Sequence, residues 1–231
     1  MDLLKRYDRQ ILMSEIGEEG QRRLKASHVV VVGAGGLGSP VLTFLVNAGV
    51  GKISFFDDDV VSVSNLQRQF LYASAQVGER KVDCAKEFLS QRNPEVEING
   101  YAQRFDDSPL VHDLVAQCDA VVDCCDNFQT RYLFNDLCVQ YGKPMVYGAI
   151  NALAGQVAIL CHPAGKATYR TLFPESSGAK ANKAVLGPTP GIVGSVQALQ
   201  TILLLAGSPK VLIDCLWTID LSTMMSNVFD L

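Results

Sequence analysis

The sequence is poor in the residues that mark several classes of protein. It has three histidines among 231 residues, and its seven cysteines include no pair spaced C-x-x-C. It therefore offers none of the usual zinc motifs. Its net charge of −4 gives no electrostatic reason to expect nucleic acid or an anionic membrane as a partner. Any anion-binding site must be built locally, from a few residues.

Long hydrophobic runs are also missing. The N-terminal stretch M-D-L-L-K-R-Y-D-R-Q interleaves charged and apolar residues, so we expect no signal peptide. The apolar run at 198–206 is interrupted by Gln200 and Thr201 and is too short to cross a bilayer. Most of the cysteines lie within apolar runs, where they are expected to be buried and reduced. We therefore expect a cytoplasmic protein.

What the sequence does contain is an alternation of strand and helix patterns. H-V-V-V-V (28–32) is a continuous β-branched run, typical of a strand buried on both faces. The alternation predicts an α/β fold, namely a Rossmann-like, mostly parallel sheet with helices on both faces, extended by antiparallel strands at the C-terminal end. The further strands are expected at 52–57, 95–101, 119–125, 144–147, 155–160, 212–220 and 225–231, and the helices at 81–91, 109–117, 128–141 and 191–207.

The whole chain, 1–231, is expected to form a single domain. Residues 1–27 should be N-terminal helices broken near Gly17 and Gly20, and 28–160 the nucleotide-binding core. A crossover loop would occupy 161–190, followed by a C-terminal helix and strands at 191–231. The stretch from Lys166 to Gly191 has no helical or strand periodicity, and a loop of that length is usually functional or mobile. We expect it to close over a bound partner.

A glycine loop follows the first strand. The segment G-A-G-G-L-G (33–38) fits G-x-G-x-x-G between a strand and a helix. The glycines permit a tight turn, and the helix N-terminus attracts phosphate. An acidic residue about twenty positions later can accept hydrogen bonds from ribose hydroxyls, although a solvated strand end is the alternative. The candidate nucleotide-binding residues here are Gly33, Gly35, Gly36, Gly38, Asp57 and Asp59.

Polar residues beyond Asp57 separate two kinds of enzyme. A nicotinamide-dependent oxidoreductase would explain the glycine loop equally well, but hydride transfer expels no polyphosphate. Arg68 and Lys81 can neutralise charge on a leaving pyrophosphate. Asp126 ends a strand where the ligands of parallel sheets gather, and a carboxylate there suits Mg²⁺, with the buried-strand residue Asp123 as the weaker alternative. The candidates of this group are Asn65, Arg68, Gln69, Lys81, Asp126 and Asn127.

Several longer motifs resemble the ThiF/MoeB/HesA family, the bacterial relatives of ubiquitin-activating enzymes. They are R-Y-D-R-Q (6–10), G-A-G-G-L-G-S-P, N-L-Q-R-Q, D-C-C-D-N-F-Q-T-R and G-P-T-P-G, and together they cover essentially the whole chain. The resemblance implies ATP-dependent adenylylation of the C-terminal glycine of a ubiquitin-like sulfur carrier ending in Gly-Gly, of the ThiS or MoaD type. Pyrophosphate would leave, and the pathway would be thiamine or molybdopterin synthesis.

The resemblance also implies roles for single residues. Gly36 and its loop would contact ATP, Asp57 the ribose, and Asp126 would hold Mg²⁺. Arg9 resembles an arginine that reaches into the neighbouring subunit's site, which implies a homodimer. The residues that would surround the phosphates are Asn65, Arg68, Gln69 and Lys81. The catalytic candidates are thus Arg9, Asn65, Arg68, Lys81 and Asp126.

The chain departs from the family pattern at its cysteines. Thr168 and Thr171 stand where relatives carry the first zinc-binding C-x-x-C pair, and no second pair follows the last strand. We therefore predict no zinc. Lys180 stands where many relatives carry a cysteine that links covalently to the carrier, so we expect activation without that covalent step. A non-catalytic ATP-binding relative and an NAD-dependent oxidoreductase are the alternative functions.

Overall fold

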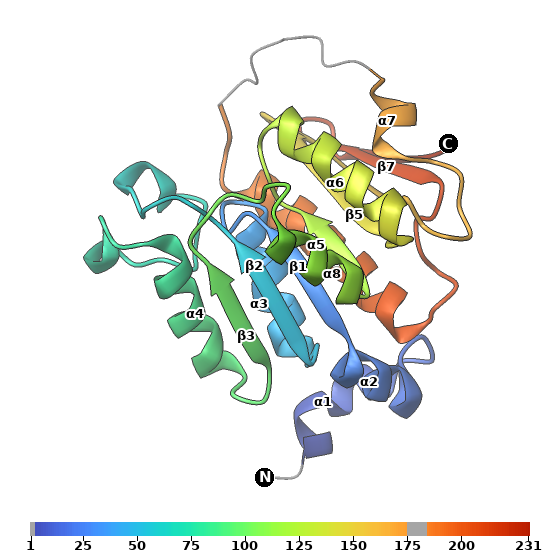
Figure 1. Cartoon of the computed structure of the whole chain (residues 1–231), viewed down its shortest axis with the longest axis horizontal. Coiled ribbons are helices and arrows are strands. Elements are labelled where there is room, and N and C mark those ends of the chain that lie inside the picture. The colour runs from blue at the N-terminus through green and yellow to red at the C-terminus, as the bar shows by residue number, and fades with distance from the viewer. Residues whose placement is uncertain (1–2, 175–183) are drawn as a thin grey trace.

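The structure is a computed structural model that describes residues 3–174 and 184–231. Within these residues one eight-stranded sheet has the order β3-β2-β1-β4-β5-β6-β7-β8 (Figure 1). The strands from β3 to β5 run parallel, and β6, β7 and β8 are added antiparallel. This confirms the expected fold class. The strands are β1 (His28–Val32), β2 (Lys52–Phe56), β3 (Glu97–Tyr101), β4 (Ala120–Asp123), β5 (Met145–Asn151), β6 (Ala154–Leu160), β7 (Cys215–Asp220) and β8 (Met225–Asp230).

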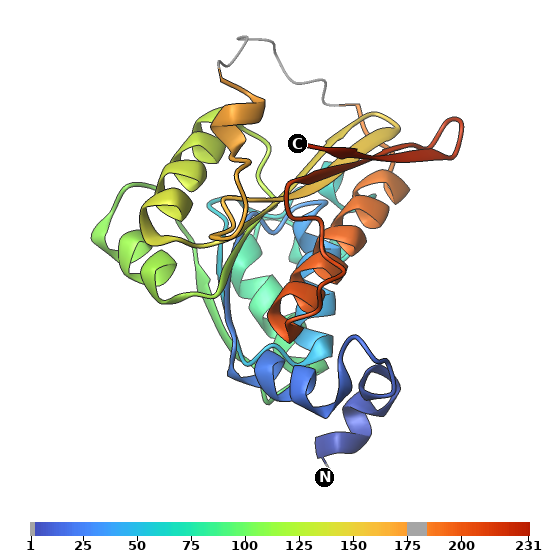
Figure 2. The same cartoon turned by 90° about the vertical axis from the view of Figure 1, so that its right-hand side faces the viewer.

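Helices cover both faces of the parallel strands. Apolar side chains of α3, α4 and α8 pack on one face of the sheet, and those of α5, α6 and α7 pack on the other (Figures 1 and 2). The β-branched run of β1 lies between them and is buried at every position. The helices are α1 (Leu3–Ile11), α2 (Gly17–Ala26), α3 (Gly38–Ala48), α4 (Lys81–Arg92), α5 (Pro109–Gln117), α6 (Phe128–Tyr141), α7 (Tyr169–Leu172) and α8 (Pro188–Ala206).

Several expected boundaries are wrong. Strand β5 continues to Asn151 instead of ending at 147, because it pairs along its whole length with β6. The expected irregular stretch contains the short helix α7, and α8 begins at Pro188 rather than at 191. Gly20 does not break α2, since it packs against Ala206 inside the fold. Residues 175–183, which include Lys180, lie outside the described part of the chain.

Helix α8 packs beside α3 on one face of the sheet (Figure 2). Among the described residues it is the helix long and apolar enough to cross a membrane by length and composition alone. Its contacts with α3, β5, β6 and α2 bury just over half of it within the fold. These contacts make α8 a core helix, and its first turn lies beside the glycine loop, where a Cβ on Gly36 would lie 3.1 Å from the Cβ of Pro190.

Candidate active site

The glycine loop turns tightly from β1 into α3. Gly33 has φ +99°, and a Cβ there would collide with the carbonyl oxygen of Cys124 at the end of β4. A Cβ on Gly38 would collide with the carbonyl oxygen of Gly33. Glycine is therefore required for this turn. The loop leads directly into the N-terminus of α3, a position whose free amides and positive dipole suit a phosphate group.

Asp57 follows β2 and holds the loop in place. Its Oδ2 accepts a hydrogen bond from the Ala34 amide at 2.8 Å, and its Oδ1 accepts one from the Asp59 amide at 3.0 Å. Burial raises the pKa of the Asp57 carboxyl, and the positive charge of Lys81 opposes that rise. A carboxylate oxygen can accept two hydrogen bonds, so Asp57 retains capacity for a ribose hydroxyl while it organises the loop.

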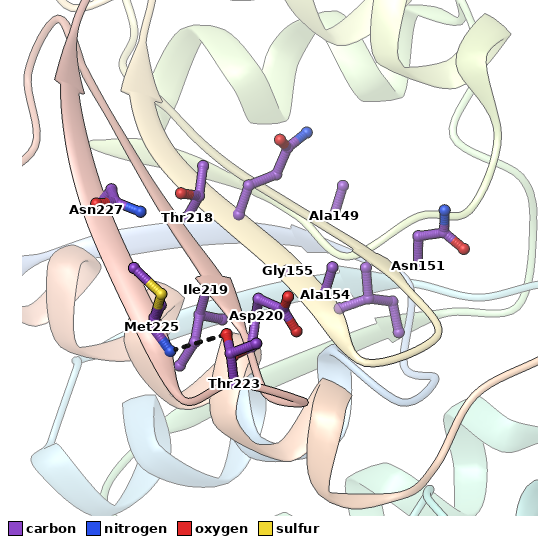
Figure 3. Close-up of a pocket in the computed structure, with 12 residues that line it drawn as sticks. Ala149, Asn151, Ala154, Gly155, Thr218, Ile219, Asp220, Thr223, Met225 and Asn227 are labelled. Atoms are coloured by element: carbon purple, nitrogen blue, oxygen red, sulfur yellow. Dashed lines mark hydrogen bonds between the residues drawn. The ribbon is translucent and has the colours of Figure 1, made fainter.

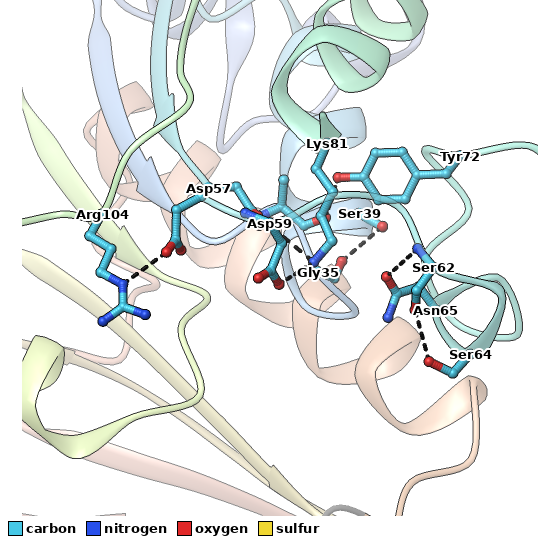
Figure 4. A network of polar contacts seen from close by, with 12 residues as sticks. Gly35, Ser39, Asp57, Asp59, Ser62, Ser64, Asn65, Tyr72, Lys81 and Arg104 are labelled. Atoms are coloured by element: carbon cyan, nitrogen blue, oxygen red, sulfur yellow. Dashed lines mark hydrogen bonds and ion pairs between the residues drawn. The ribbon is translucent and has the colours of Figure 1, made fainter. Parts of the chain in front are cut away.

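Lys81, the first residue of α4, is buried against these acids. Its side chain is 5% exposed, and its Nζ lies 2.7 Å from Asp59 Oδ2 and 3.7 Å from Asp57 Oδ1 (Figure 4). The Asp59 side chain is 67% exposed. Tyr72 completes the cluster by donating its hydroxyl to the carbonyl oxygen of Ala34 at 2.7 Å. Sequence reasoning missed Tyr72, which ends the polar stretch 61–72 without any motif of its own.

The segment that contains Asn65, Arg68 and Gln69 also packs against the glycine loop. Asn65 Oδ1 accepts a hydrogen bond from the Ser62 amide at 3.1 Å, so this side chain shapes the turn (Figure 4). Arg68 donates to the carbonyl oxygen of Ser64 at 2.9 Å, and its Cδ would lie 3.5 Å from a Cβ on Gly36. The guanidinium is thus tethered at the edge of the glycine loop.

Two buried polar atoms beside the loop lack a partner. Gln69 is 4% exposed, its Nε2 would lie 3.5 Å from a Cβ on Gly35, and its Oε1 makes no hydrogen bond. The hydroxyl of Thr189, in the first turn of α8, is likewise buried and unpaired. Such atoms are costly unless something satisfies them. Both residues lie next to the glycine cradle, whose turn and helix N-terminus suit the phosphates of a nucleotide.

The loop after β4 carries the other acidic candidates. Asp126 is exposed, whereas Asn127 caps α6 by accepting a hydrogen bond from the Thr130 amide at 2.9 Å. The competing residue Asp123 is completely buried and paired with Arg131 at 2.8 Å. Solvent cations cannot approach Asp123, which leaves Asp126 as the carboxylate open to Mg²⁺. Cys124, two residues before Asp126, touches the glycine loop at Gly33.

Arg9 is not brought to this site within its own chain. It is exposed on α1, and α1 is fixed at the far end of α3, where Gln10 donates to the carbonyl oxygen of Ala48 at 2.9 Å. The 11-residue helix α3 is about 16 Å long and separates α1 from the glycine loop. Arg9 therefore stands apart from the glycine loop and from the candidate residues beside it.

A hollow of about 570 Å³ lies on one face of the antiparallel extension (Figure 3). It begins on β5, the strand next to β4, whose end leads to Asp126. Sequence reasoning missed this hollow, because it depends on the pairing of four strands. Its lining residues include Ala149, Asn151, Gln156, Thr218, Met225 and Asn227.

Comparison with known proteins identifies the family. The sequence profile of the ThiF family matches residues 7–231. The chain is 47% identical over 207 residues to the SAMP-activating enzyme E1 of Haloferax volcanii, which covers 87% of this chain and 76% of that protein. It is 45% identical over 216 residues to the sulfur carrier protein adenylyltransferase of Thermus thermophilus, with coverage of 90% and 79%.

A solved structure agrees at the level of the fold. The crystal structure of PaaA superposes with a TM-score of 0.85, covering 98% of this chain and 73% of PaaA at 23% identity. The fold, the glycine loop with its neighbouring cations and the profile match over nearly the whole length agree with one another. The chain belongs to the ThiF family and is one of its adenylyltransferases.

Proposed function

We propose that the protein activates the C-terminal glycine carboxylate of a small ubiquitin-like sulfur carrier as an acyl-adenylate. The observation that carries this proposal is the placement of two cations beside one glycine loop, Arg68 next to Gly36 and Lys81 next to the Asp57 that binds the Ala34 amide. The name of the Thermus thermophilus relative, a sulfur carrier protein adenylyltransferase, supports the class of substrate. Thiamine or molybdopterin synthesis is the proposed setting, in the cytoplasm, in keeping with seven cysteines that form no disulfide.

The proposed reaction needs no side-chain nucleophile or general base. A carboxylate oxygen of the carrier forms a bond to the α-phosphorus of ATP, and the bond from that phosphorus to the bridging oxygen of pyrophosphate breaks. Pyrophosphate leaves with the electron pair, and no proton moves, because the attacking carboxylate is already ionised. The task of the protein is to hold two anions together and to offset the charge of the leaving group.

Lys81 must exchange its partner before it can contact a phosphate. Its ammonium is held by Asp59 at 2.7 Å. Because the Asp59 side chain is largely exposed, water can solvate that carboxylate once a phosphate takes its place. Asp57 is buried and stays beside Lys81 to hold it near the loop. Asp59 thus keeps the buried lysine paired until nucleotide arrives.

Asp126 is the proposed protein ligand of Mg²⁺. Magnesium usually binds through one or two carboxylates together with substrate phosphates and water. A lone accessible carboxylate fits that pattern, and residues 3–174 and 184–231 contain no cluster of three or more metal-binding side chains. When bound, the ion would neutralise phosphate charge.

Zinc does not fit the residues at the position of the first C-x-x-C pair. The hydroxyl of Thr168 accepts a hydrogen bond from the Thr171 amide at 3.2 Å and caps α7. Structural zinc sites use thiolate and imidazole ligands, which these threonines cannot supply. The absence of zinc stays a prediction.

In a homodimer, Arg9 of one copy would lie at the glycine-loop site of the other copy. Since α1 lies at the far end of α3, Arg9 can complete only the site of another copy. Phe44 of α3 and Leu199 of α8 are about half exposed, and Ile192 of α8 is about one-third exposed. A partner surface against these two helices would cover apolar side chains close to the glycine loop.

The hollow on β5 to β8 is the proposed path of the carrier's C-terminal tail. Helix α7 packs on the same face of the sheet, and Val185 pairs with Ala152 at the β5–β6 turn. The described ends of the crossover loop therefore flank the hollow. The expected closure of the crossover loop involves residues 175–183, which lie outside the described chain. The proposed path of the carrier tail therefore rests on the described ends of the loop, at α7 and Val185.

The proposed function is tested by exchange of labelled pyrophosphate into ATP. Exchange is expected only when a carrier ending in Gly-Gly is present, and a carrier that lacks its final glycine is the matched control. Tight ATP binding without exchange across a panel of carriers would instead support a non-catalytic relative. Binding of NAD in place of ATP would overturn the assignment.

A further inference from the structure

A buried ion pair lies directly behind the loop that carries Asp126. Arg131 Nε is 2.8 Å from Asp123 Oδ2. The side chain of Asp123 is completely buried, and that of Arg131 is 9% exposed. Neither residue can contact a ligand from this position. The pair belongs to the D-C-C-D-N-F-Q-T-R motif, yet the proposed chemistry gives it no role.

The pair forms hydrogen bonds with both backbone groups of Cys125. Arg131 donates to the carbonyl oxygen of Cys125 at 2.8 Å, and Asp123 Oδ1 accepts from the Cys125 amide at 3.0 Å. Both backbone groups of the residue before Asp126 are thereby fixed. Arg131 also donates to the carbonyl oxygen of Gly148 on β5 at 3.2 Å. The loop is thus tied to α6 and to the neighbouring strand.

Helix α8 joins the same network from the other face of the sheet. Gln197 is completely buried, and its Nε2 donates to the carbonyl oxygen of Asp123 at 2.7 Å. A Cβ on Gly148 would collide with the Gln197 carboxamide, so glycine makes room for it. The first turn of α8 borders the glycine loop. The network therefore connects the Asp126 loop to α8 and, through α8, to the glycine loop.

Stability alone is a weak reason for such a pair. A buried ion pair often contributes less than well-packed apolar residues of similar volume, because both charges lose their hydration. Its hydrogen bonds do, however, select one backbone conformation. Groups that orient a metal ligand from behind typically change metal affinity about 10-fold to 100-fold when they are altered.

We propose that Arg131 and Asp123 are positioning residues, which hold the Asp126 carboxylate at the distance from the glycine loop that magnesium–ATP requires. This inference rests on the proposed role of Asp126 as the Mg²⁺ ligand. Arginine is needed because its planar guanidinium donates in several directions at once, whereas lysine offers a single charged centre.

The test compares Arg131→Lys with Arg170→Lys. Arg170 forms a comparable pair with Asp136, at 2.7 and 2.6 Å, but on the surface and away from the loop. Binding of a non-hydrolysable ATP analogue is measured by calorimetry while Mg²⁺ is varied, and thermal melts confirm folding. Arg131→Lys is expected to raise the Mg²⁺ concentration for half-maximal binding about 10-fold, without changing metal-free affinity. Arg170→Lys should match the wild type.

Gln197→Met provides a second variant should Arg131→Lys fail to fold. It removes one hydrogen bond to the network and leaves the ion pair intact, so a rise of about fivefold in the Mg²⁺ requirement is expected. An unchanged requirement in a folded Arg131→Lys protein, or in Gln197→Met when Arg131→Lys does not fold, overturns the inference alone. A wild type that binds the analogue equally well without Mg²⁺ overturns the magnesium role of Asp126 and this inference with it.

Discussion

The parallel half of the sheet and its antiparallel extension are built on different principles. In the parallel half, β1 and β4 are buried at every position between two helical layers. In the extension β8 is exposed along its whole length, with Met225 at 63% and Phe229 at 52%. The first region is a fully packed frame that carries the glycine loop, and the second leaves apolar side chains exposed. Apolar exposure of this kind typically marks an interaction surface.

The largest loss of activity is expected from a substitution beside the glycine loop. Arg68→Ala is expected to lower carrier-dependent pyrophosphate exchange about 100-fold or more, because the proposed function assigns the charge of Arg68 to the leaving pyrophosphate. Arg80→Ala, which breaks only the exposed pair with Asp83, is the matched control and should keep its activity. Full exchange in Arg68→Ala would remove Arg68 from the site.

Truncating a side chain should lower the free energy of unfolding much more in the parallel half than in the extension. Leu42 of α3 is completely buried, so Leu42→Ala is expected to lower the free energy of unfolding by about 2–5 kcal/mol. Phe229→Ala, on the open strand β8, should lower it by about 1 kcal/mol or less. Urea denaturation followed by circular dichroism measures both. Equal losses would mean that the extension belongs to the core.

Carrier recognition, unlike ATP binding, should depend on the extension. Met225 lines the hollow and is exposed, and Met225→Glu would place a charge where the carrier tail is proposed to lie. The KM for the carrier should rise about 10-fold, and the KM for ATP should stay the same. Ser226→Glu, whose side chain lies on the other face of the same strand, is the control. A change in the KM for ATP instead would contradict the division of roles.

The proposed homodimer would place Arg9 of one copy at the glycine loop of the other. Arg9→Ala and Arg68→Ala should each be inactive alone, but a refolded equal mixture should recover about a quarter of wild-type activity. Half of its dimers are mixed, and each mixed dimer holds one complete site. Exchange assays measure this recovery. No recovery in a mixture shown to be dimeric would exclude sharing of Arg9 between copies.

The smallest effect concerns thiol reactivity. Burial raises the pKa of Cys125, in the frame, well above its usual range, and it also raises the pKa of Cys215 in the extension. A raised thiol pKa keeps the reactive thiolate scarce until the pH climbs toward that pKa. At pH 8 both should therefore alkylate slowly, with Cys215 ahead of Cys125, as measured by mass spectrometry of labelled peptides. Faster labelling of Cys125 would show that its loop opens.

The comparison also explains how much could be predicted from the sequence. The Val run of β1, the glycine loop and the helices α5 and α6 carry local patterns, and their predicted bounds agree with the structure. The hollow and the contacts of Tyr72 and Arg131 depend on pairings between distant segments. The identity of one residue does not predict which distant residue it will contact. Asn127 shows the reverse limit, because the motif that marks it as a nucleotide-binding candidate does not predict that its side chain also caps α6.

Mass spectrometry of a candidate sulfur carrier, incubated with the protein and magnesium–ATP, tests the central claim most directly. The account predicts one added AMP on the C-terminal glycine, lost in the Arg68→Ala protein and absent from a carrier without the final glycine. An unmodified carrier, across a panel of carriers and under conditions where the wild type binds ATP, would contradict it.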